Sequence, residues 1–106
     1  MKLSDLSGAL MTDLYELTMA ASYYEEDLNA PATFSLFVRN YPPHRSYLVA
    51  AGLEDAINYT RSLRFTDDDL AYLDRTGLFP KDFLQHLKDF SFSGQIHAMP
   101  EGTLFF

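Results

Sequence analysis

The stretch that decides how this chain begins to fold is Met11-Thr12-Asp13-Leu14-Tyr15-Glu16-Leu17-Thr18-Met19. Asp13 can cap the start of a helix, and Glu16 follows three residues later, which is the spacing of a capping box. Behind this cap, apolar residues recur at helical spacing, namely Leu14, Leu17, Ala21 and Tyr24. We therefore expect a helix that begins after Asp13 and ends at the acidic residues 25–27, before Pro31.

Tyr15 lies off this apolar stripe, on the side of the helix that also carries Met19 and Ser22. On the residues alone, Asp13 is an ordinary helix cap and Tyr15 an ordinary core aromatic. An aromatic side chain outside the core-facing stripe is, however, free to stack on something else. A flat heteroaromatic acid and a partner subunit are both open as what it contacts.

The residues after this helix alternate in the manner of a strand. Residues 32–39 place Phe34, Leu36 and Val38 on one face, and Arg39 closes the segment. Pro42-Pro43 then requires a loop, because proline donates no hydrogen bond to a strand ladder. Residues 47–51 form a short apolar run that suits a strand or a helix.

The second half of the chain predicts three helices and a hairpin. Residues 53–63 show a helical face, Thr66 and Asp69 have capping-box spacing with Gly77 suited to follow that helix, and Pro80 suits the first turn of another. Two strands at 96–98 and 103–106, joined by a turn at 100–102, are expected to form a hairpin. The fold class predicted is α+β, a single domain over residues 1–106 with a small antiparallel or mixed sheet and several helices packed against it.

Composition excludes several functional classes. The 106 residues carry a formal net charge of -7, which argues against nucleic acid as the main partner. There is no cysteine, so disulfides, thiolate nucleophiles and thiolate metal sites are excluded. No apolar run approaches the roughly 20 residues of a membrane span, and we expect a cytoplasmic protein without a membrane partner.

Few residues suggest chemistry by themselves. Arg39, His44 and Arg45 flank the proline loop, and an arginine fork suits phosphate, although a solvated cluster is the plainer interpretation. His86 and His97 are isolated, and the acidic run 67–69 suits the first turn of a helix. We therefore expect no metal site and nominate no catalytic residue in this chain.

Four segments, taken in order, resemble a known family. They are residues 12–19, the strand Phe34-Ser35-Leu36-Phe37-Val38-Arg39, the helix start Gly52-Leu53-Glu54-Asp55-Ala56-Ile57-Asn58-Tyr59, and residues 92–103. Together they cover nearly the whole chain, and the ordered set is specific although each segment alone is weak. The chain is similar to the N-terminal domain of the nicotinate phosphoribosyltransferases, which are type II phosphoribosyltransferases.

This resemblance implies a function for the complete enzyme. Members of the family join nicotinate to phosphoribosyl pyrophosphate, giving nicotinate mononucleotide and pyrophosphate in NAD salvage, with ATP hydrolysis and Mg²⁺. It also implies a missing barrel domain and a head-to-tail homodimer, in which the N-terminal domain of one subunit completes the site of the other. In that arrangement Tyr15 stacks on the pyridine ring, Asp13 lines the same pocket and Arg39 faces the phosphates.

Two interpretations of the chain follow. In the first it is a part truncated from a longer enzyme, with no cofactor of its own and inactive alone. In the second it is a stand-alone, non-enzymatic binding or interaction module that has kept the same fold.

Overall fold

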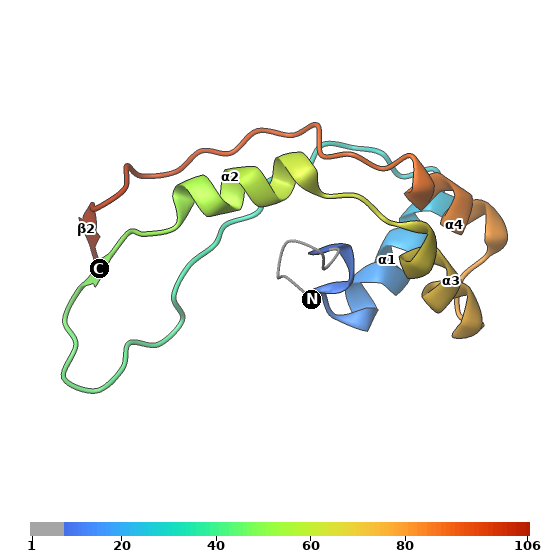
Figure 1. The fold of residues 1–106 in the computed structure, drawn as a ribbon. Coiled ribbons are helices and arrows are strands. Elements are labelled where there is room, and N and C mark those ends of the chain that lie inside the picture. The colour runs from blue at the N-terminus through green and yellow to red at the C-terminus, as the bar shows by residue number, and fades with distance from the viewer. Residues whose placement is uncertain (1–7) are drawn as a thin grey trace.

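The computed structural model describes residues 8–106, which form an α+β arrangement of helices and one small sheet (Figure 1). In chain order the elements are the 3-10 turn η2 (Gly8–Leu10), α1 (Leu14–Glu25), β1 (Leu48–Val49), α2 (Leu53–Ser62), α3 (Asp67–Arg75), α4 (Lys81–Lys88) and β2 (Leu104–Phe105). The predicted fold class is confirmed, and so are all four predicted helices. Residues 1–7 of the predicted domain lie outside the described residues.

The hydrophobic core lies where α1, α3 and α4 meet, at one end of the molecule (Figure 1). Phe83 and Leu73 are its most deeply buried side chains, with 1% and 2% of their surface exposed. Both come from amphipathic helices whose other faces are charged, so burying one stripe of each helix accounts for the cluster. Its remaining buried members are Ala21, Phe79, Leu84 and Leu87.

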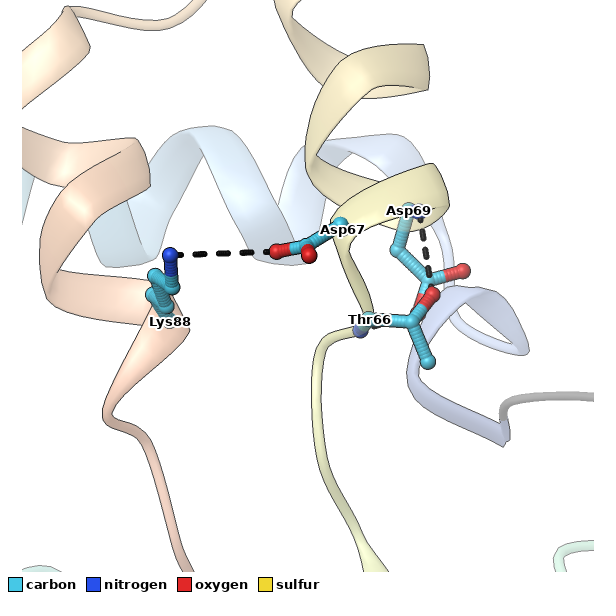
Figure 2. A network of polar contacts seen from close by, with 4 residues as sticks. All are labelled: Thr66, Asp67, Asp69 and Lys88. Carbon is cyan, nitrogen blue, oxygen red and sulfur yellow. Dashed lines mark hydrogen bonds and ion pairs between the residues drawn. The ribbon is translucent and has the colours of Figure 1, made fainter.

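The ends of α3 follow the predicted capping pattern (Figure 2). The amide of Thr66 donates to Oδ2 of Asp69 at 2.8 Å, and the amide of Asp69 donates to Oγ1 of Thr66 at 3.2 Å. Gly77 follows the helix with a φ of 69°, the left-handed conformation that glycine adopts most readily. The acidic run 67–69 therefore serves the helix start, as predicted.

The sheet pairs two segments that are far apart in the sequence. Strands β1 and β2 are antiparallel, with Leu48 opposite Phe105 and Val49 opposite Leu104. This resolves the open choice for residues 47–51 in favour of a strand. The predicted hairpin is wrong: the turn at 100–103 forms, with a φ of 83° at Gly102, but residues 96–98 are not a strand. Alternating residues indicate strand character but do not name the partner, and here β2 pairs with β1.

The predicted strand at residues 32–39 is also wrong. The segment has no regular secondary structure, and Figure 1 draws the chain between α1 and β1 as a long uncoiled trace. Phe34 and Leu36 are 90% and 104% exposed. A strand is stable only when a neighbour pairs with its backbone N–H and C=O groups, and no described segment does so here.

The chain is therefore extended, and much of its surface is exposed. Its radius of gyration is 16.8 Å, whereas a compact domain of this length has about 13 Å. Its exposed surface is 9160 Å², against roughly 6,000 Å² for a compact chain of this mass.

Candidate functional site

Helix α1 begins in a way that fixes where Tyr15 stands. Asp13 is the N-cap residue in an extended conformation, and its amide donates to Oε2 of Glu16 at 3.2 Å. The hydroxyl of Thr12 donates to the same carboxylate oxygen. The acidic first turn also suits the positive end of the helix dipole. Tyr15 is thus the second residue of a helix whose start is well defined.

The two faces of α1 differ in burial. Leu17 and Ala21 pack toward the core formed with α4, as the apolar stripe predicted, and the Tyr24 ring lies 5.9 Å from that of Phe83. Leu14, the first residue of the predicted stripe, is instead 52% exposed. Tyr15 is 60% exposed and Met19 is 46% exposed, so the face they share is not covered by any described residue. The exposure confirms that Tyr15 is not a core aromatic. Its ring is available to stack on a ligand or on another chain.

Arg39 lies outside the helical cluster, in the irregular segment between α1 and β1. It is exposed, and no hydrogen bond or ion pair within residues 8–106 occupies its guanidinium group. Arg45 is exposed as well, and its amide donates to the carbonyl of Pro42 at 3.2 Å, which closes the proline loop. His44, in the same loop, has a φ of 64°. The structure brings Arg39 and Arg45 to one loop region but joins neither to Tyr15.

The two remaining histidines, His86 and His97, make contacts within the domain. The ring of His86 packs on that of Tyr24 at a centroid distance of 4.7 Å, beside the core residue Phe83. Nε2 of His97 lies 3.4 Å from Oε1 of Gln95. Within residues 8–106, no group of three or more His, Cys, Asp or Glu residues could hold a metal ion.

One contact at the start of α2 was missed by the sequence analysis. The carboxylate of Glu101 accepts hydrogen bonds from the amide of Gly52 at 2.7 Å and of Leu53 at 3.2 Å. It thereby ties the turn before β2 to the N-terminus of α2. The signal was present, because a helix that begins after glycine has no side-chain cap of its own and needs one from elsewhere.

Neither of two surface depressions among the described residues is lined by Tyr15 or Arg39. The larger, about 530 Å³, lies beside the Glu101 contact and is lined by Gly52, Leu53, Glu54, Asp55, Ile57, Asn58, Arg61 and Glu101. The smaller, about 310 Å³, lies between α3 and α4. Three acidic residues make the larger depression unsuited to an anionic ligand.

These features define an α+β domain that presents a capped helix with an exposed aromatic ring and a separate arginine whose side chain is unpaired within residues 8–106. A family model described as the nicotinate phosphoribosyltransferase (NAPRTase) N-terminal domain matches residues 10–106. The chain belongs to this family, as the resemblance of its ordered segments predicted.

Curated relatives agree with the family. The chain is 46% identical over 99 residues to nicotinate phosphoribosyltransferase pncB2 of Mycobacterium tuberculosis, which covers 93% of this chain. It is 42% identical over 103 residues to nicotinate phosphoribosyltransferase of Bacillus subtilis, covering 96% of this chain, and 36% identical over 103 residues to that of Homo sapiens, covering 92%. The match takes in 21%, 21% and 19% of these relatives, so the chain spans about a fifth of their length. Among the described residues no helix is both long and apolar enough to cross a membrane.

Proposed function

We propose that this chain is the N-terminal domain of a longer, cytoplasmic nicotinate phosphoribosyltransferase. The complete enzyme joins nicotinate to phosphoribosyl pyrophosphate and releases nicotinate mononucleotide and pyrophosphate, with ATP hydrolysis coupled to the reaction. The observation that carries this proposal is the family match over residues 10–106, together with relatives that bear the name of this activity.

In this enzyme Tyr15 stacks on the pyridine ring of nicotinate. The support is its position, because the ring is 60% exposed on a rigid helix whose other face is anchored in the core. A planar aromatic ring recognises another by offset stacking, which fixes the plane of the substrate. Asp13, the exposed N-cap residue of the same helix, lines the same pocket.

Arg39 contacts the phosphates of the second substrate. Its guanidinium is exposed and free of ion pairs within residues 8–106, so its charge is not already neutralised by the domain. A planar fork of N–H donors matches phosphate oxygens. Positive charge there stabilises the pyrophosphate as it leaves, while stacking holds the pyridine nitrogen near the ribosyl carbon.

The rest of the machinery lies elsewhere in the enzyme. Tyr15 and Arg39 share no hydrogen bond or ion pair within residues 8–106. In the proposed head-to-tail dimer, both belong to one N-terminal domain and complete the site on the barrel of the partner subunit. The barrel domain of the longer protein holds Mg²⁺ and ATP. By this proposal the isolated 106-residue chain has no activity.

The proposal is tested in the longer protein with the variants Tyr15→Ala and Tyr15→Phe. Stacking contributes about 1–3 kcal/mol for a flat ring, so Tyr15→Ala should raise the KM for nicotinate by about 5- to 150-fold. Tyr15→Phe keeps the ring and should stay close to the parent. Steady-state kinetics at saturating phosphoribosyl pyrophosphate and ATP measure both.

Two outcomes would overturn the proposal at different levels. An unchanged KM for nicotinate in Tyr15→Ala would remove Tyr15 from the site but leave the enzyme assignment. A coding frame that stops after Phe106, with no phosphoribosyl transfer by its product, would favour the stand-alone binding module instead.

A further inference from the structure

Helix α1 differs from the other helices in what its exposed face carries. Between residues 17 and 24 it has no charged side chain. Helices α3 and α4 instead place charged residues on their outer faces, among them Asp67, Asp74, Lys81 and Lys88. Apolar side chains make up most of the exposed part of α1 over these residues, with Ser22 as the exposed polar one.

Three exposed residues of α1 stand in one row. Tyr15, Met19 and Tyr23 follow one another at intervals of four residues and are 60%, 46% and 47% exposed. Residues four apart are neighbours on a helix surface, so each side chain of this row borders the next. Single exposed apolar residues need no explanation, but three in one row make a continuous strip.

Within this row Met19 stands one turn after Tyr15. Long side chains in a helix lean toward its N-terminus and cover the turn before their own Cα atom. By this rule the side chain of Met19 leans toward Tyr15, its neighbour four residues earlier on the helix surface. Methionine sulfur makes favourable contacts with aromatic rings, often at the ring edge, and leaves the face of the ring open.

We infer that Met19 is a positioning residue for Tyr15, selecting the ring orientation that receives a flat aromatic acid. This inference rests on the proposed function, because it assigns a support to the stacking tyrosine. An unsupported ring divides its time between the two χ1 rotamers that a helix permits. Affinity falls in proportion to the fraction of time spent in the wrong one, so holding the ring lowers the KM for nicotinate without touching the reacting atoms.

The experiment compares Met19→Ala with Met19→Leu in the longer enzyme. Met19→Ala should raise the KM for nicotinate about 2- to 10-fold with little change in kcat, a range that follows from the strength of one sulfur–aromatic or i,i+4 contact. Met19→Leu keeps the volume over the ring and should restore most of the affinity. Alanine is the best helix former, so the loss cannot come from unwinding α1.

The decisive measurement is a double-mutant cycle with Tyr15→Ala. If Met19 acts through Tyr15, Met19→Ala has no further effect once the ring is gone. A matched control is Tyr72→Ala, which removes a 54% exposed aromatic from α3 and should leave the KM unchanged.

The outcomes separate this inference from the proposed function. A raised KM in Tyr15→Ala with none in Met19→Ala would overturn the role of Met19 alone. An effect of Met19→Ala that persists without Tyr15 would also overturn it, because Met19 would then make a contact of its own. If neither variant changes the KM for nicotinate, neither Tyr15 nor Met19 belongs to the nicotinate site.

Discussion

The two ends of this molecule are built in different ways. At one end α1, α3 and α4 bury a common core, and Phe83 and Leu73 are almost wholly covered. At the other, two strands of two residues each form the only sheet of residues 8–106. Phe34 and Leu36, in the irregular segment between α1 and β1, and Phe106, after β2, are at least 90% exposed. Apolar side chains meet in a packed core at the helical end, whereas these three find no such core within residues 8–106.

The two residues of the proposed site lie in these differently built parts of the domain. Tyr15 lies on α1, which packs against the core, and Arg39 lies in the irregular segment between α1 and β1. In the proposed enzyme, the position of Tyr15 is fixed before other protein binds, and that of Arg39 is set when its segment is covered.

The largest predicted difference is in stability, between a variant that removes a phenylalanine from the core and one that removes a phenylalanine from the irregular segment. Phe83→Ala should cost about 3–5 kcal/mol, because it leaves a cavity in the only packed core of the described chain. Domains of this size have only about 5–15 kcal/mol in total, so the variant should be largely unfolded at mild urea concentrations. Phe34→Ala should change the free energy of unfolding by less than about 0.5 kcal/mol. Urea titration of the 106-residue chain, followed by far-UV circular dichroism, measures both.

An equal loss in the two variants would contradict the comparison. It would mean that residues 32–39 pack as tightly as the core, and that the predicted strand forms in solution after all.

The next test asks whether the two ends open independently. Glu101→Ala removes the carboxylate that accepts the amides of Gly52 and Leu53. A hydrogen bond to a charged acceptor contributes more than a neutral one, and partial exposure reduces its value to about 1.4 kcal/mol, or tenfold in local opening. Hydrogen exchange of the Gly52 and Leu53 amides should therefore accelerate about tenfold. Glu101→Gln keeps one acceptor oxygen and should have a smaller effect.

The amides of α3 provide the internal reference for this experiment. Exchange at Leu73 should be unchanged in both Glu101 variants, because the core does not involve the β1–β2 end. Equal acceleration at Leu73 would show that the whole domain opens as one unit.

The same division explains how far the sequence could predict the structure. Helix starts and ends are decided locally, so Asp13, Thr66 and Gly77 were sufficient to place α1 and α3. Pairing of β1 with β2 joins residues more than fifty positions apart, and alternation at 32–39 or 96–98 carries no information about a partner. Glu101 was missed for the same reason, since the amides it accepts lie 48 and 49 residues earlier.

The same distinction between local and long-range information applies to the candidate site. The apolar stripe left Tyr15 off the core-facing side, but on the residues alone Tyr15 was interpreted as a core aromatic, and its 60% exposure overturns that interpretation. The surroundings of Tyr15 and Arg39 could not be predicted, because the residues that complete the pocket are supplied by other parts of the proposed enzyme.

The smallest predicted effect tests how much the N-cap of α3 stabilises the helical end. Thr66→Ala removes the hydroxyl that caps the amide of Asp69, and should lower the free energy of unfolding by about 1 kcal/mol (Figure 2). Thr66→Ser keeps that hydroxyl and should stay within about 0.3 kcal/mol of the parent, since serine and threonine cap almost equally well. Lys88→Ala is the matched control, because the Lys88–Asp67 ion pair in the same view spans 3.8 Å between exposed side chains and contributes little. Urea titration orders the three variants, and a loss in Lys88→Ala as large as in Thr66→Ala would mean that α3 is held by its charges rather than by its cap.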